Sequence, residues 1–205
     1  MAYVPLDLPE GLPEPVESVI RCGVEPLFQD VHWMLATTIG EAYDKGPSRQ
    51  LQIPAAHMLL AAVSGISTEL YRRDPSDHNT GTRFKQCLVA YFPWDVDPPS
   101  GVSNVGATHI LYKIFRNPLV HSLGHHRVGM KETKIGCVFR GTAESERRVE
   151  ELERLTVKPY SVPCLAVSCA SQTLWLDPLY WGVRKLVERW ARDETEVAYA
   201  AAKLR

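Results

Sequence analysis

Arg116, Asn117 and His121 bring a permanent cation, an amide and a titratable imidazole together within six residues. An arginine offers fixed, charge-assisted donors to a phosphate, and an imidazole exchanges a proton near neutral pH. These residue types therefore have the chemistry to bind a phosphate and to move a proton beside it. The residues just before them, 110–115, have the apolar pattern of one face of a buried helix.

The proline at position 118 decides how these side chains can be placed. A proline inside a helix removes a hydrogen bond and crowds the carbonyl four residues earlier, and it disfavours the helical conformation at Asn117. The helix therefore either kinks at Pro118, or stops and restarts with Asn117 as N-cap and Pro118 in the first turn. If the segment after Pro118 is helical, Asn117 and His121 are four residues apart and share a face.

Four segments before and including this region have apolar residues at helical spacing, and they predict helices over about 25–43, 54–72, 82–91 and 105–115. Pro26 fits the first turn of the first helix, and Pro54 fits the start of the second. Residues 1–15 contain four prolines, which fix φ and remove donors. We therefore expect an extended arm that lies across the domain or across a partner subunit.

The pattern changes after Gly129. Clusters of β-branched and apolar residues predict short strands near 134–140 and 162–169, with a charged, exposed helix over 144–155 between them. An amphipathic helix is expected to begin near Asp177–Pro178 and to bury Leu179, Leu186 and Trp190. The expected organisation is mainly α: an arm of residues 1–15, a helical domain of 16–128 and a small α+β extension of 129–205.

Composition narrows the class of protein. A chain of 205 residues that is 45% hydrophobic can form one domain with a real core, alone or with an appended subdomain. The formal net charge of −1 argues against a surface that is basic throughout, although a local basic cleft is still compatible with it. Five scattered cysteines without a Cys-x-x-Cys pair predict buried thiols in a reducing compartment. Without a signal peptide or a long uninterrupted apolar run, we expect a cytoplasmic protein and no membrane.

The form Arg-Asn-x-x-x-His at positions 116–121 resembles the motif of the HEPN superfamily, many of whose members are small helical ribonucleases of bacterial defence and toxin systems. A second similarity lies upstream, where residues 81–85 (Gly-Thr-Arg-Phe-Lys) and 91–93 (Tyr-Phe-Pro) resemble the third-helix region of HEPN-like families. The resemblance covers roughly residues 25–125. It implies a four- to five-helix up-down bundle that forms homodimers, with two motifs facing each other in one composite cleft.

The resemblance also implies a reaction and site residues. It implies metal-independent endoribonuclease activity, in which the ribose 2′-OH attacks the adjacent phosphate, with no cofactor and no metal. Carried over, His121 is the general base or acid, Arg116 holds the phosphate, and Asn117 orients the imidazole or holds the RNA backbone. The second helix of some members carries a further polar residue, for which Ser64 and Glu69 are both candidates. The residues expected to bind RNA phosphates are Arg83, Lys85, His125, His126 and Arg127.

Other interpretations of these residues remain open. The motif can be structural, with Arg116 at the carbonyl end of a helix and His121 in the core. A HEPN-like fold can also bind RNA, a nucleotide or a protein without catalysis, as an antitoxin-like module or with a protein antitoxin as partner. A metal site is a further alternative, formed by His109, His121, His125 and His126, although no carboxylate or cysteine stands at ligand spacing. The aromatic set Trp175, Tyr180, Trp181 and Trp190 fits core packing or a dimer surface better than a base-stacking platform.

Overall fold

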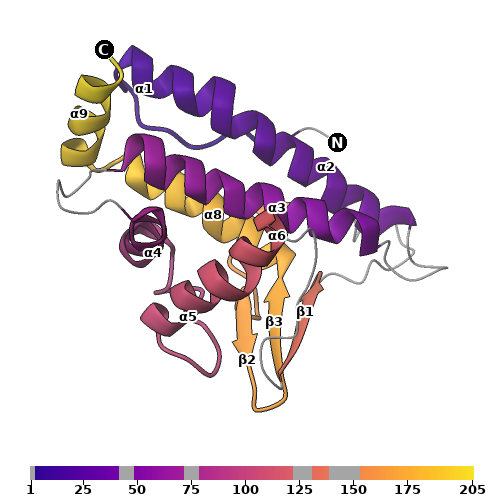
Figure 1. Ribbon diagram of the computed structural model, residues 1–205. Helices are drawn as coiled ribbons and strands as arrows, with labels where there is room; N and C mark the ends of the chain where they lie inside the picture. The colour runs from indigo at the N-terminus through magenta and orange to yellow at the C-terminus, as the bar shows by residue number, and fades with distance from the viewer. Residues whose placement is uncertain (1–2, 42–48, 72–78, 122–130, 139–152) are drawn as a thin grey trace.

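Helices make up most of the structure, and a small mixed sheet lies at one end of them (Figure 1). The computed structural model describes residues 3–41, 49–71, 79–121, 131–138 and 153–205; within these ranges the side chains of 37–41, 49–50, 120 and 121 are not described. The expected mainly helical fold class is therefore confirmed.

Two long antiparallel helical runs form the upper layer of Figure 1. The first runs from Glu14 to Glu41 as α1 (Glu14–Val19), a π-helical turn η1 (Ile20–Val24) and α2 (Glu25–Glu41). The second consists of α3 (Arg49–Gly65) and the π-helical turn η2 (Ile66–Leu70). The expected start near 25 matches the start of α2, although the helical run already begins at Glu14; the expected start near 54 was wrong, because Pro54 lies inside α3.

The third expected helix is α4 (Thr80–Tyr91), which Asn79 caps by accepting a hydrogen bond from the Gly81 backbone N–H at 2.9 Å. The fourth is a continuous run of α5 (Asn104–Ile110), the π-helical turn η3 (Leu111–Arg116) and α6 (Asn117–His121). Asn117 has helical backbone angles, φ −64° and ψ −47°, so the helix does not restart there and Asn117 is not an N-cap.

The π-helical turn gives a physical reason why the helix passes through Pro118. In η3 the Asn117 backbone N–H bonds to the Tyr112 carbonyl, five residues earlier, instead of four. This wider turn changes the hydrogen-bond register just before Pro118, which has no backbone N–H to donate. Prolines and π-bulges are the usual causes of such helix irregularities. The turn η1 stands in the same relation to Pro26.

The sheet of the described residues contains β1 (Glu132–Gly136), β2 (Leu165–Val167) and β3 (Ser171–Trp175), in the order β1-β3-β2. β1 pairs parallel with β3, and β2 pairs antiparallel with it. The sequence patterns predicted β1, with a start two residues too late, and β2, too long at both ends, and they did not predict β3; residues 139–140 of the first expected strand lie outside the described residues. Most of the expected charged helix over 144–155 lies outside the described residues, and residues 153–157 are helical.

The helix expected near Asp177–Pro178 is confirmed as α8 (Leu176–Trp190), and α9 (Glu194–Lys203) follows it. α8 packs against α2, α3 and α4, and most of its side chains are buried. Tyr180, Trp181 and Trp190 are among them, so these aromatic side chains pack in the core and do not form a base-stacking platform. One continuous hydrophobic cluster joins Leu6 of the arm, the helices of 16–128 and α8.

Residues 51–70 form a helical stretch that is long and apolar enough to span a membrane by length and composition alone. Half of this stretch is buried inside the structure, where α2, α4 and α8 pack against α3. Its apolar character is therefore explained by its place as a core helix.

Candidate functional site

Arg116, at the end of η3, contacts three side chains: those of Ser64, Asn117 and Tyr112. Its Nε donates a hydrogen bond to Ser64 Oγ on α3 at 3.3 Å, and its Nη1 donates to Asn117 Oδ1 at 3.2 Å. Its guanidinium also lies over the Tyr112 ring, 5.5 Å from the ring centroid. The side chain is half-buried. These contacts fix the orientation of a planar cation, which is what recognition of a phosphate requires.

Ser64 is the polar residue of the second long helical run that meets the motif. Its hydroxyl donates to the Leu60 carbonyl at 2.9 Å, so its oxygen is free to accept from Arg116. Glu69, the other candidate, is exposed on η2 and forms an ion pair with Lys203 of α9 at 3.4 Å. The tertiary structure thus distinguishes two residues that the sequence left equivalent.

The amide oxygen of Asn117 accepts from Arg116, so in this structure Asn117 orients the guanidinium. The backbone from Asn117 to His121 is helical, which places the two residues on one face as expected. The side chain of His121 lies outside the described residues, as do His125, His126 and Arg127. The expected roles of these histidines and of Arg127 therefore remain predictions.

Tyr112 links the motif to α4 and was not singled out from the sequence. A Cβ on Gly81 would lie 2.6 Å from the Tyr112 ring, so glycine makes room for the tyrosine at the start of α4. The Phe84 ring lies 5.4 Å from that of Tyr112. The signal was present in the sequence, since Tyr112 precedes Arg116 by four residues and a helical turn brings such pairs together.

Arg83 and Lys85, both expected to bind RNA, lie on different faces of α4. Lys85 shares a face with Gly81 and Phe84, the residues that contact Tyr112, and it is half-buried. Arg83 is only 5% exposed, and its Nε and Nη1 have no hydrogen-bond partner among the described residues. Lys85 therefore lies on the Tyr112-facing side of α4, whereas Arg83 is buried; the expected role of both residues in RNA binding remains a prediction.

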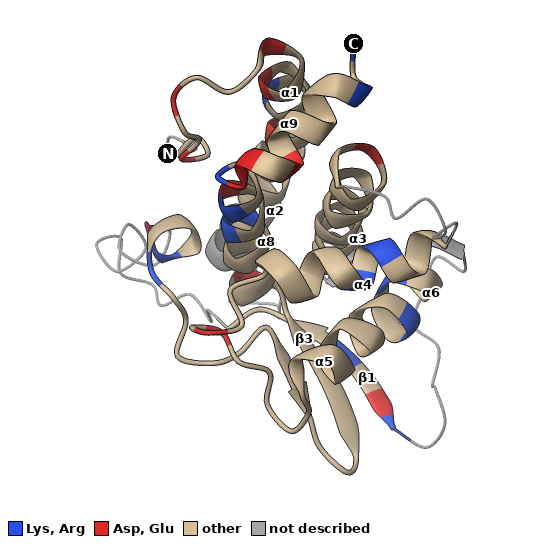
Figure 2. Cartoon of the chain, turned by 90° about the vertical axis from the view of Figure 1, so that its left-hand side faces the viewer, with Lys and Arg blue, Asp and Glu red and all other residues tan. Residues whose placement is uncertain are grey.

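Several basic residues lie on this side of the molecule. Figure 2 shows basic segments around α4, α6 and β1 and others on α8, while acidic segments lie around α1 and α9 and also on β1. Within the described ranges, Lys85, Lys113 and Arg116 form no ion pair with a carboxylate, and Lys134 of β1 pairs with Glu132 at 3.0 Å. Cations without a carboxylate partner among the described residues therefore lie on α4 and η3 of a chain whose net charge is −1.

The metal alternative receives no support from the residues that can be placed. His109 is exposed on α5, and the side chains of the other three histidines are not described. Elsewhere in the described structure, no three His, Cys, Asp or Glu side chains gather as a ligand set would.

No family model matches this chain, and no curated protein or solved structure shows significant similarity to it. Any functional conclusion therefore depends on the geometry around Arg116.

Proposed function

We propose that this protein is a HEPN-like RNA-binding protein and a metal-independent endoribonuclease, with Arg116, Asn117 and His121 in its active site. The observation that carries the proposal is the fixed guanidinium of Arg116, held by Ser64 and Asn117. An arginine in a fixed orientation suits a group that carries charge on several oxygens, as a phosphodiester does.

The proposed reaction starts from the ribose 2′-hydroxyl. Its oxygen forms a bond to phosphorus while the bond from phosphorus to the 5′-oxygen breaks, which gives a 2′,3′-cyclic phosphate and a 5′-hydroxyl. His121 accepts the proton of the 2′-hydroxyl or supplies the proton of the leaving 5′-oxygen. Arg116 balances the negative charge that develops on the phosphoryl oxygens, and the half-buried position of its side chain strengthens that interaction.

The finer features of the proposal follow from the same resemblance. They are an up-down arrangement of the four helical runs, a homodimer in which two Arg116–His121 segments face each other, a cytoplasmic location, and a role in a defence or toxin–antitoxin system with a protein antitoxin. Single-stranded RNA is the proposed substrate class, because its backbone can bend into an in-line geometry.

The experiment is cleavage of single-stranded RNA by purified protein, with and without EDTA. Wild type is expected to cleave in both conditions and to leave a 2′,3′-cyclic phosphate. Both Arg116→Ala and His121→Ala are expected to reduce the rate at least 100-fold, as loss of a charge-stabilising or acid–base group does. The matched control is His109→Ala, which removes an exposed histidine on α5 and is expected to leave the rate unchanged. Full cleavage by His121→Ala would contradict the catalytic proposal.

A second candidate function is binding without cleavage. Two donor groups of Arg116 already bond to Ser64 and Asn117 within the chain. A guanidinium held in this way suits a fixed binding surface as well as a catalytic one. The same RNA in a fluorescence anisotropy titration distinguishes the two. Binding that Arg116→Ala weakens, with no cleavage by wild type, selects the binding function.

A further inference from the structure

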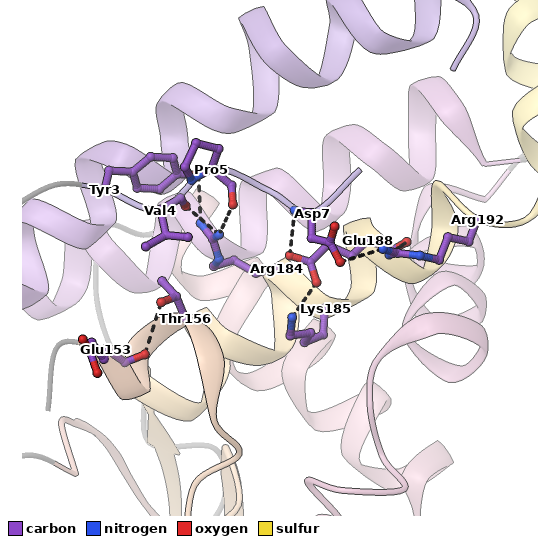
Figure 3. Close-up of polar contacts among 10 residues, drawn as sticks. All are labelled: Tyr3, Val4, Pro5, Asp7, Glu153, Thr156, Arg184, Lys185, Glu188 and Arg192. Atoms are coloured by element: carbon purple, nitrogen blue, oxygen red, sulfur yellow. Dashed lines mark hydrogen bonds and ion pairs between the residues drawn. The ribbon is translucent and has the colours of Figure 1, made fainter. Parts of the chain in front are cut away.

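A buried arginine holds the N-terminal arm, residues 3–8, against α8. Arg184 is only 1% exposed. Its Nη1 donates to the Tyr3 hydroxyl at 2.8 Å, and its Nη2 donates to the Val4 and Pro5 carbonyls at 2.7 and 3.0 Å (Figure 3). The arm therefore lies across its own domain, and a single guanidinium supplies three of the bonds that fasten it.

Further contacts continue along the arm. The Leu6 amide donates to Glu25 Oε1 at 2.8 Å, the Asp7 amide donates to Glu188 Oε1 at 3.2 Å, and the Asp7 carboxylate pairs with Arg192 at 2.7 Å. Gly11, with φ +80°, then forms a turn between Pro9 and Pro13. Leu6 is fully buried and Tyr3 and Leu8 pack partly against the core, so polar and apolar contacts together hold the arm, and the turn at Gly11 is where its direction can change.

His32 of α2 lies under the arm. It is 2% exposed, and neither of its ring nitrogens has a hydrogen-bond partner among the described residues. The Tyr3 and Tyr180 rings stand 6.0 and 6.3 Å from the imidazole, measured between centroids. The same two rings lie under the Arg184 guanidinium, at 5.1 and 5.7 Å. The imidazole and the guanidinium therefore share one aromatic enclosure.

The groups around His32 disfavour a second positive charge. Burial, and then the Arg184 cation, lower the pKa of His32 from its usual value. Tyr3 faces it from the arm, Tyr180 and Arg184 from α8, and Trp33 from its own helix. The neighbouring carboxylates, Glu25 and Glu188, are bonded to arm amides and to Arg21 and Lys185.

We propose that the arm is a proton-sensitive strap, which opens when His32 takes up a proton. With the arm closed, the imidazole is buried, has no hydrogen-bond partner among the described residues and lies near the Arg184 cation; with the arm open, water reaches it. The inference concerns the N-terminal arm and does not rest on the ribonuclease proposal.

The direction and size of the effect follow from linkage. The closed state disfavours the proton, so closure is fully stable above the pKa of an open, hydrated imidazole and is lost as pH falls below it. With an ordinary value of about 6.5 for the open state, the ratio of open to closed arm rises by at most roughly 25-fold between pH 7 and pH 5.

The test is amide hydrogen exchange at Leu6 and Asp7 between pH 7 and pH 5, after correction for the intrinsic pH dependence of exchange. In wild type, the ratio of open to closed arm is expected to rise as pH falls, up to the roughly 25-fold maximum. In His32→Leu, this ratio is expected to stay constant with pH. Two controls are expected to keep the wild-type profile. His109→Gln removes an exposed histidine elsewhere, and Glu188→Gln removes a titrating carboxylate while keeping an acceptor for Asp7.

The proposal is overturned if arm opening in His32→Leu depends on pH as it does in wild type. It is also overturned if Glu188→Gln, and not His32→Leu, removes the pH dependence. If His32→Leu does not fold, NMR titration of the wild-type imidazole replaces it. Uptake of the proton by His32 in step with arm opening supports the strap. An imidazole that stays neutral while the arm opens overturns it.

Discussion

At the scale of single residues, the chemistry of this protein depends on how Arg116 is held. It donates hydrogen bonds to residues of two elements far apart in the sequence, Ser64 on α3 and Asn117 on α6. Ser64 can accept because its own proton is directed to the Leu60 carbonyl. Arg116 is thus oriented by a residue 52 positions away, and no local pattern contains that contact.

Replacement of Ser64 tests this arrangement. Ser64→Ala removes one acceptor of the guanidinium, so we expect RNA cleavage or binding to weaken about fivefold, which corresponds to about 1 kcal/mol for one hydrogen bond. Ser64→Thr keeps the hydroxyl and is expected to restore most of the loss. Glu69→Gln is the matched control on the same helical run and is expected to have no effect. Equal losses from Ser64→Ala and Glu69→Gln would argue against a specific role of Ser64.

At the scale of elements, the π-helical turn η3 decides where the motif points. A π turn adds a residue to the helical circuit, so the residues after it face a different direction from those of a regular α-helix. Pro118 lies two residues after the end of η3, and Tyr112 near its beginning packs against Gly81 and under Arg116. The helix therefore presents Arg116 toward α3 because of the irregular turn.

Pro118→Ala is the corresponding test. The variant restores a backbone N–H, so the chain can return to regular α-helical bonding, which rotates Arg116 relative to Ser64. We expect the RNA-dependent readout to fall at least as far as in Ser64→Ala, while the unfolding midpoint does not decrease, because alanine is the better helix former. Circular dichroism and the RNA assay measure the two quantities. A large loss of stability with unchanged RNA activity would contradict this account of η3.

At the scale of the whole molecule, α8 joins parts that the sequence places far apart. It packs against α2, α3 and α4, follows β3 directly, and carries the arginine that holds the arm. The loop before α5 is tied to the sheet in a similar way. There the buried Asp97 accepts the Cys164 amide at 3.0 Å, just before β2.

This buried carboxyl predicts a pH dependence of global stability. Burial raises the pKa of Asp97 from 3.8 to about 6, so the folded state holds this proton more tightly than the unfolded chain. The stability that protonated Asp97 contributes is fully present below its pKa in the unfolded chain, 3.8, and is lost as pH rises through its folded-state pKa of about 6. The loss is at most about 3 kcal/mol. Urea unfolding at pH 4 and pH 7 should therefore show a smaller decline in Asp97→Asn than in wild type.

Asp95→Asn is the control for that measurement. Asp95 is exposed and pairs with Arg189 at 2.8 Å, and that arginine lowers its pKa, so its contribution is small and has the opposite sign. An Asp97→Asn variant that declines with pH as steeply as wild type would show that Asp97 is not the group responsible.

The sequence predicted most helices because their apolar spacing is a local property. It placed α4 and α8 within a few residues, and it missed the continuous helices through Pro26 and Pro54, where packing overrides the usual reading of proline. It also missed β3, whose stretch of Ser171, Gln172 and Thr173 has little apolar character and whose strand pairs with both neighbours. Strand pairing is decided by partners, and single-sequence patterns do not contain them.

The sequence by itself therefore determined the mainly helical class and the chemical types at positions 116, 117 and 121. Only the tertiary structure decided that Ser64 meets Arg116, that Arg83 is buried, and that the arm lies on α8 over His32. The physical reason is the range of the interactions. Helix formation and residue chemistry act within a few positions, whereas burial, hydrogen-bond partners and electrostatic environment depend on segments that meet only in the folded chain.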